Sequence, residues 1–326
     1  MDRPSLPPIP MADVLGDPDL IRRLVEVNGP YAPVQRYFAN QAEMDALAGE
    51  DTEAMLAVIA PNFRGDWAYD EPQIEGVEPI LGHAGFIRAA ADLFGAEIVR
   101  PQQVYANLTW KLPFHQGGGH TDIPAFRGFD RTQYPVTFLS LMGHSGLFEA
   151  ERIKIATGVA WFYKGPDGGF EWWPDGPDAP PRVHEGAIHN TAFMGDNDFM
   201  YHRARAVGTP AEGMVEGMTL DSRLVHRGDS RFAIEEGGTT LAEMPFDELR
   251  ISISWKAVVF TDGAEAARHD DHTHDLTRDE VIDRIAEGLG AEGIAMPTLD
   301  EDPTRTPELI KAMRQVWLHE PTVFAA

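Results

Sequence analysis

The sequence predicts a mainly β protein with helical N- and C-terminal extensions. Residues 103–260 hold several short runs that are rich in β-branched and aromatic side chains and are separated by turn residues. Patterns with a helical period fall instead near the two ends of the chain. Strands without alternating helices favour a sandwich or barrel over βαβ units.

Composition limits the classes of function. The chain has 326 residues, 43% of them apolar, which is ordinary for a globular protein. It has no cysteine, so any metal must be held by His, Asp or Glu. The net charge of −25 argues against nucleic acid or an anionic membrane as partner. Since the N-terminus lacks an apolar signal core, we expect a cytoplasmic protein.

Residues 1–102 are expected to form a mainly helical scaffold. Apolar spacing predicts helices over 11–27, 43–59 and 76–94. The segment 61–79 between them is rich in turn residues.

The strand-rich core is expected to begin near residue 103. Its last strand, 249–260, is the clearest in the chain, and its alternation places Arg250, Ser252 and Ser254 on one face. A turn at 195–197 separates two of the other segments. The expected strands before 249–260 are 103–112, 153–163, 170–173, 190–194 and 198–202.

Residues 261–326 return to a helical pattern. Thr277 and Glu280 form a capping-box pattern that opens a helix, and Pro307 starts a last one. The histidine-rich tract 269–274 is interpreted as a solvated loop and not as a metal site.

Two metal-binding side chains lie close together in the core. His120 and Asp122 are two positions apart, so in an extended strand they point to the same side. Nitrogen and oxygen ligands together suit iron, manganese or zinc. The preceding glycines, 117–119, are interpreted as a turn that leads into this strand.

Taken in order, four segments resemble the Fe(II)/2-oxoglutarate-dependent dioxygenases, and within them the phytanoyl-CoA-hydroxylase-like group. The resemblance implies a double-stranded β-helix (jelly-roll) core over 103–260 within a single catalytic domain, 1–326. It also implies an oxidoreductase that uses Fe(II), 2-oxoglutarate and O2 to hydroxylate a small molecule and releases succinate and CO2. The segments are His120-Thr121-Asp122, Gly168-Gly169-Phe170-Glu171, Asp196 to His202, and Arg250-Ile251-Ser252.

The same resemblance assigns roles to individual residues. His120, Asp122 and His202 would bind the metal, and the carboxylate of Asp122 favours hydroxylation over halogenation. Arg250 would pair with the distal carboxylate of 2-oxoglutarate, and Ser252 would add a hydroxyl bond.

Four further side chains are weaker candidates for ligand contacts. Asn107 and Thr109 share one face of the strand before the glycines and are candidates for contacts to 2-oxoglutarate. Arg127 and Arg131 follow the metal strand and are candidates for binding a substrate anion.

One departure from the family leaves alternatives open. Arg250 follows His202 at a much longer interval than in most relatives, which an insertion over 204–246 would explain. Arg205 could then take the role of Arg250, or His226 that of His202. We favour His202, because it ends a strand-like run after a turn, whereas His226 lies among polar residues.

Two other functions compete with this interpretation. One is a jelly-roll or cupin-type metalloenzyme that does not use 2-oxoglutarate, for which Arg250 would be unnecessary. The other is a non-catalytic relative that binds a small molecule.

Overall fold

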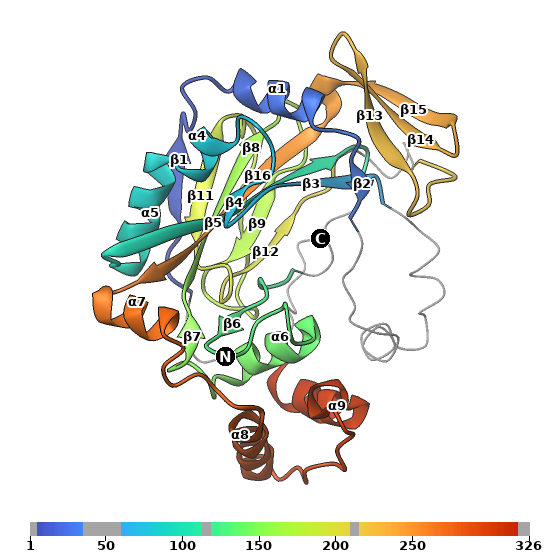
Figure 1. Ribbon diagram of the computed structural model, residues 1–326. Helices are drawn as coiled ribbons and strands as arrows, with labels where there is room; N and C mark the ends of the chain where they lie inside the picture. The colour runs from blue at the N-terminus through green and yellow to red at the C-terminus, as the bar shows by residue number, and fades with distance from the viewer. Residues whose placement is uncertain (1–4, 35–59, 113–118, 209–214, 319–326) are drawn as a thin grey trace.

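The computed structural model of the chain describes residues 5–34, 60–112, 119–208 and 215–318. It is mainly β, with helices on the outside of the sheets and at the C-terminal end (Figure 1). The expected mainly β class with several helices is therefore confirmed. The helix predicted over 43–59 and the glycines at 117 and 118 lie outside the described residues.

An eight-stranded antiparallel sheet forms the centre of the described part. Its order is β1-β11-β8-β16-β5-β3-β2, and β4 pairs with β3. The strand β16 lies in the middle and pairs with β5 on one side and β8 on the other. The bounds are β1 Ile9–Ala12, β2 Ala32–Pro33, β3 Asn62–Tyr69, β4 Glu71–Pro72, β5 Ile98–Thr109, β8 Ile155–Phe162, β11 Thr191–Gly195 and β16 Arg250–Phe260.

The N-terminal third differs from the sequence-based expectation. Residues 62–69 form β3, not turns, because pairing with β5 and burial of Phe63 and Trp67 outweigh the turn-forming composition. Residues 9–12 form β1, so the first helix, α1 (Asp19–Val27), begins only after Pro18. The pattern over 76–94 divides into α4 (Glu78–Leu81) and α5 (Ala84–Phe94).

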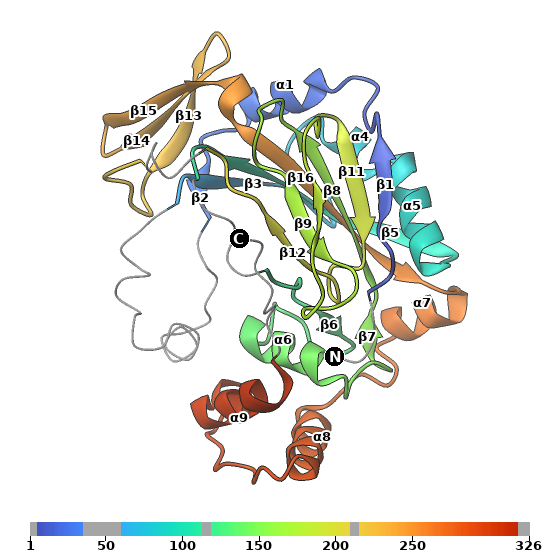
Figure 2. The ribbon, with the colours of Figure 1, turned by 180° about the vertical axis from the view of Figure 1, so that it is seen from behind.

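The central strand β16 has two chemically different faces, as its alternation predicts. Ile251, Ile253 and Trp255 belong to the main hydrophobic core, and the Trp255 ring lies 5.5 Å from that of Phe86 in α5. The helices α4 and α5 cover this outer face of the sheet (Figures 1 and 2). The opposite, inner face carries Arg250 and every second residue after it.

A second, three-stranded sheet packs against the inner face. It consists of β9 (Phe170–Trp173) between β10 (Arg182–His184) and β12 (Tyr201–Ala204). One buried cluster joins Trp161 and Phe193 of the main sheet to Phe170 and Trp172 of the second. The inner face of β16 therefore lies between two sheets (Figure 2).

The segment 204–246, which had no predicted elements, contains a third sheet. It is an antiparallel meander of β13 (Arg223–Gly228), β14 (Arg231–Glu236) and β15 (Thr239–Pro245), followed by the 3-10 turn η3 (Phe246–Glu248). Both turns have two residues at positive φ, Asp229-Ser230 and Gly237-Gly238. Such turns match the twist of paired strands, so these dipeptides were the signal for hairpins.

Three helices form a separate core at one end of the molecule (Figure 1). They are α6 (Val136–Ser145), α8 (Arg278–Ala291) and α9 (Pro307–Trp317), and they enclose Phe129 and Phe148 near the small sheet of β6 (Ala125–Phe126) and β7 (Arg152–Ile153). The capping box that begins α8 and the proline that begins α9 are as predicted.

The tract 269–274 is exposed as expected except for His269, but it starts in the last turn of α7 (Gly263–Asp270) and is not entirely loop. Among the described residues, no helix combines the length and apolarity that crossing a bilayer needs.

Candidate metal centre

His120, Asp122 and His202 come together in space although eighty positions separate the last two in sequence order. Each offers one ligand atom, and these atoms lie within 4.8 Å of one another. Within the described ranges, this is the one cluster of three His or acidic groups with that spacing. The structure thus brings together the three residues that the family resemblance selects.

Backbone pairing places the three side chains. His120 and His202 form an antiparallel bridge, with N–H to O distances of 3.0 and 2.9 Å in the two directions. The Asp122 N–H donates to the Asn197 carbonyl at 2.8 Å, so the turn before β12 holds this end of the segment. The two imidazole rings lie 4.6 Å apart between centroids.

His202 has its ring orientation fixed by the backbone. Its Nδ1 lies 2.9 Å from the Met200 carbonyl oxygen. Because a carbonyl only accepts, Nδ1 must carry a proton, so the neutral form of this ring has its lone pair on Nε2. That Nε2 lies 3.8 Å from Asp122 Oδ1, on the side where a shared ion would bind.

Asp122 is ionised at neutral pH. Burial alone would raise its pKa, but the charge of Lys256 and the hydrogen bond from its ammonium hold the pKa far below its usual value. Lys256 Nζ donates to Asp122 Oδ2 at 2.6 Å, and Thr157 Oγ1 donates to the same oxygen at 3.3 Å. Asp122 Oδ1 takes part in neither of these hydrogen bonds and lies toward the two histidines.

The donor set fits a divalent transition metal. Two imidazole nitrogens and one carboxylate oxygen on one side of an ion match the arrangement that non-haem Fe(II) oxygenases use, with open positions for other ligands. The His202 tautomer and the ionised Asp122 both suit metal binding, since ligands must offer lone pairs.

Arg250 is a buried cation on the same inner face. It is 3% exposed, its Nε donates to the Gly168 carbonyl, and its Nη2 lies 3.5 Å from the Gly169 carbonyl. Burial lowers its pKa to about 10, so the guanidinium stays charged at neutral pH. Among the described residues, no carboxylate forms an ion pair with it.

The other predicted 2-oxoglutarate contacts surround Arg250. Thr109 is directly opposite Arg250, and Asn107 is directly opposite Ser252, in the pairing of β5 with β16. Thr109 Oγ1 is already bonded to Asn62 Oδ1 at 2.8 Å, and Ser252 is buried. Arg250, Ser252 and Asn107 therefore share one polar surface between the sheets.

Sequence reasoning missed the contact of Lys256 and the role of Gly168 in this surface. Lys256 continues the alternation of Arg250, Ser252 and Ser254, so its face could have been predicted, but its partner Asp122 could not. Gly168 has φ of +73°, and a Cβ there would lie 2.7 Å from Arg250 Cδ, so the Gly-Gly pair makes room for the guanidinium.

The alternative candidates lie in other surroundings. Arg205 already pairs with Glu185 and lies 3.5 Å from Glu171, unlike Arg250. His226 lies in β13 with its ring 5.1 Å from that of Phe232, and it is not in the cluster of possible ligands.

Two arginines, Arg127 and Arg131, were predicted to bind a substrate anion. Arg127 donates to the Ala150 carbonyl at 3.2 Å, and Arg131 is exposed.

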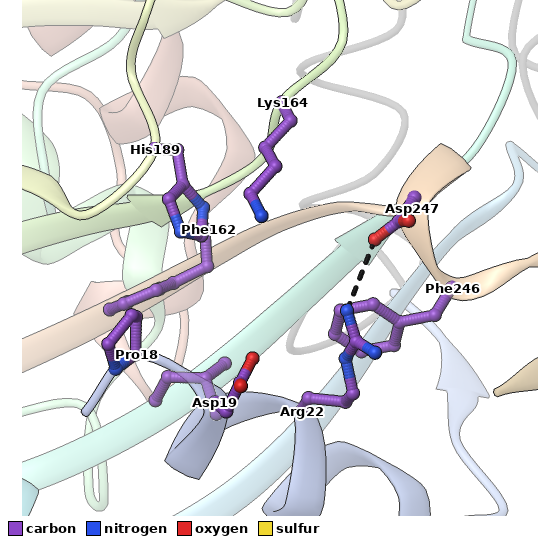
Figure 3. A pocket seen from close by; sticks show the side chains of 9 residues that line it. Pro18, Asp19, Arg22, Phe162, Lys164, His189, Phe246 and Asp247 are labelled. Atoms are coloured by element: carbon purple, nitrogen blue, oxygen red, sulfur yellow. Dashed lines mark hydrogen bonds and ion pairs between the residues drawn. The ribbon is translucent and has the colours of Figure 1, made fainter.

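A cavity lies on the outer side of the main sheet. It is formed by α1, the end of β8 and η3, and its lining includes Phe162, whose neighbour Trp161 faces inward (Figure 3). Its cations Arg22 and Lys164 are balanced by Asp19 and Asp247, and Arg22 lies 3.4 Å from Asp247. This cavity is separate from the metal centre.

No protein-family model and no curated protein matches the chain. Among solved structures, a 2OG-Fe(II) oxygenase family oxidoreductase from Burkholderia pseudomallei is 14% identical, with a TM-score of 0.40, over 78% of this chain and 85% of that one. A prolyl hydroxylase from Trichoplax adhaerens, in complex with a hypoxia-inducible-factor peptide, is 10% identical over 80% and 86%, with a TM-score of 0.40.

HygX from Streptomyces hygroscopicus, solved with nickel, 2-oxoglutarate and hygromycin B, is 9% identical over 77% of this chain and 82% of that chain, with a TM-score of 0.34. At these TM-scores the likeness assigns no function to this chain. A functional assignment therefore rests on the geometry of this chain's own residues.

Proposed function

We propose that the protein is an Fe(II)- and 2-oxoglutarate-dependent oxygenase that oxidises a C–H bond of a small organic molecule. His120, Asp122 and His202 would hold the metal, and Arg250 and Ser252 would bind the co-substrate. When bound, Fe(II) with 2-oxoglutarate and O2 supplies the oxidising power, and succinate and CO2 are released.

The observation that carries the proposal is a three-ligand cluster on the same inner face as a buried guanidinium that forms no ion pair with a carboxylate of the described residues. A cation without a carboxylate partner is costly to bury, so a site of this kind suits an anionic ligand. A guanidinium can bind a carboxylate through two parallel hydrogen bonds. A dicarboxylate that meets both features would have one end near the metal and the other at Arg250.

The residues of the chain have the tasks of binding and orientation. The Met200 carbonyl keeps the Nε2 lone pair of His202 directed at the metal position. The aromatic cluster of Trp161, Phe170 and Trp172 excludes water from the space beside His202. We also propose that the two facing sheets correspond to a double-stranded β-helix, and that the protein belongs with the phytanoyl-CoA-hydroxylase-like group.

The test is formation of succinate by the purified protein with Fe(II), 2-oxoglutarate and a panel of small organic substrates. We expect succinate only when both Fe(II) and 2-oxoglutarate are present, and its loss in Arg250→Met. The matched control is Arg205→Met, which removes an arginine that already has carboxylate partners.

Other outcomes would identify the competing functions. Substrate turnover that needs metal but not 2-oxoglutarate would indicate a different metalloenzyme. If the protein binds neither Mn(II) nor 2-oxoglutarate, the proposal is contradicted and a non-catalytic binding protein is favoured.

A further inference from the structure

We propose that Lys256 and Thr157 act as a clamp on Asp122, so that the carboxylate gives the metal one oxygen and cannot give two. The inference rests on the proposed metal site and concerns how its carboxylate is held. Lys256 and Thr157 are positioning residues in this account, since neither is offered as a metal ligand.

The two oxygens of Asp122 have different surroundings. Oδ2 accepts from Lys256 Nζ at 2.6 Å and from Thr157 Oγ1 at 3.3 Å, and these two donors lie 3.2 Å from each other. Oδ1 faces His202 Nε2 at 3.8 Å. One oxygen is thus occupied by the protein, and the other points to the metal position.

The clamp is built into the main sheet. Lys256 of β16 and Thr157 of β8 are directly opposite each other in the antiparallel pairing. Their side chains therefore leave the sheet side by side on its inner face. Asp122 reaches them from a segment whose backbone is tied to Asn197 and, through His120, to His202. Rotation of the Asp122 carboxylate would break both contacts at once.

The position of Lys256 is hard to explain by metal affinity alone. An ammonium beside a divalent cation repels it, and the side chains of Lys256 and Asp122 are only 16% and 17% exposed, which limits screening. Burial of such an ion pair is itself expensive. The arrangement does fix the orientation of the Asp122 carboxylate, and partners of metal ligands commonly have this function.

The clamp affects how many metal positions stay open. An octahedral ion has six positions, and three protein ligand atoms leave about three for other molecules. A 2-oxo acid that chelates the metal takes two of them and leaves one. If Asp122 bound through both oxygens, only about two positions would remain, and a chelating co-substrate would fill the site.

The test counts the water molecules on Mn(II) bound to the protein without co-substrate. The broadening of the Mn(II) electron paramagnetic resonance lines in oxygen-17 water reports this number. We expect about three waters in the unmodified protein and about two in Lys256→Met, because the released Oδ2 takes a metal position. Lys256→Arg should keep the number found in the unmodified protein.

Two further variants make the test independent of folding defects. Thr157→Val removes one donor without changing size and should shift the water count in the same direction, to a smaller extent. Lys154→Met is the matched control, since it removes a lysine that pairs with Glu265 at 2.9 Å, away from the cluster. It should leave the count unchanged.

The outcomes separate the clamp from the metal site. Water counts in Lys256→Met and Thr157→Val equal to that of the unmodified protein, at saturating Mn(II), would overturn the clamp and leave the proposed function standing. If Lys256→Met does not fold, Thr157→Val decides. Failure of the unmodified protein to bind Mn(II) would overturn the proposed function and the clamp together.

Discussion

Arg250 places a positive charge between the two sheets, where its guanidinium contacts the carbonyls of Gly168 and Gly169. Replacing it with methionine keeps much of the volume and removes the charge. We expect the affinity for 2-oxoglutarate to fall by roughly 2–5 kcal/mol, the usual cost of losing one partner of a buried charge pair.

Isothermal titration of Mn(II)-loaded protein with 2-oxoglutarate measures this loss. Arg250→Lys should recover only part of the affinity, because an ammonium cannot form the two parallel bonds. Equal affinity in Arg250→Met and the unmodified protein would show that the co-substrate carboxylate binds elsewhere.

Asp198 gives a prediction about pH. Burial raises its pKa to about 7, against the opposing effect of Arg152, whose Nη1 lies 3.6 Å away. The group is therefore protonated in the folded state up to pH 7, but ionised in the unfolded state above about pH 4. Folding takes up a proton in that window, so the contribution of Asp198 to stability decreases as pH rises from 4 to 7.

Asp198→Asn removes this dependence. In metal-free protein, we expect the variant to have a higher free energy of unfolding than the unmodified protein. This advantage should be larger at pH 8 than at pH 5 by roughly 2–3 kcal/mol. Urea unfolding at the two pH values measures the difference. A difference in free energy of unfolding that is the same at both pH values would mean that the pKa of Asp198 is not raised in the folded protein.

At the scale of single elements, the turn before β9 shapes the Arg250 site. Gly168→Ala would place a Cβ 2.7 Å from Arg250 Cδ on a backbone with φ of +73°. We expect 2-oxoglutarate affinity to fall about tenfold or more as the guanidinium moves, that is, by about 1.4 kcal/mol. Mn(II) affinity should stay the same.

Gly186→Ala is the control for backbone strain alone. Gly186 has φ of +84°, and an added Cβ there would meet nothing within 4 Å. Both variants should lose similar stability, and only Gly168→Ala should lose co-substrate affinity. Equal loss of affinity in both would assign the effect to strain and not to contact with Arg250.

Local sequence signals predicted the elements whose determinants are local. The alternation of β16, the capping box of α8 and the proline before α9 were readable because each lies within a few residues. The strand β3 was missed because its pairing with β5 is a tertiary effect. The meander β13–β15 was not predicted, because its segment is rich in Gly and charged residues, which obscure the alternation of strands.

The site also has parts that local sequence patterns predict and parts that only the fold brings together. The spacing of His120 and Asp122 and the face of Arg250 and Ser252 follow from strand periodicity. The choice of His202 over His226 rested on the strand-like run and the turn before His202, but only the fold shows which histidine reaches Asp122. The contact of Lys256 with Asp122 spans 134 positions, and no local pattern encodes it.

At the scale of the whole molecule, the net charge of −25 is opposite in sign to the local charges of Arg250 and Lys256 on the inner face. A dianionic co-substrate that approaches from solution meets the net negative field first. We expect its association rate with Mn(II)-loaded protein to rise severalfold between low and moderate salt, because salt screens that repulsion beyond about 10 Å.

Stopped-flow measurement of 2-oxoglutarate binding at several ionic strengths checks the sign of this effect. An association rate that falls as salt is added would mean that the local field of the two cations controls entry. The oligomeric state of the protein should be held constant across the series.

The central claim is that His120, Asp122 and His202 hold one divalent ion. The most direct measurement is equilibrium binding of Mn(II) to metal-free protein, followed by electron paramagnetic resonance, for the unmodified chain, His202→Ala and His226→Ala. We predict one site per chain that His202→Ala weakens at least about a hundredfold, a loss of about 2.7 kcal/mol, and His226→Ala leaves unchanged. Normal binding in His202→Ala, or loss of binding in His226→Ala, would contradict the account.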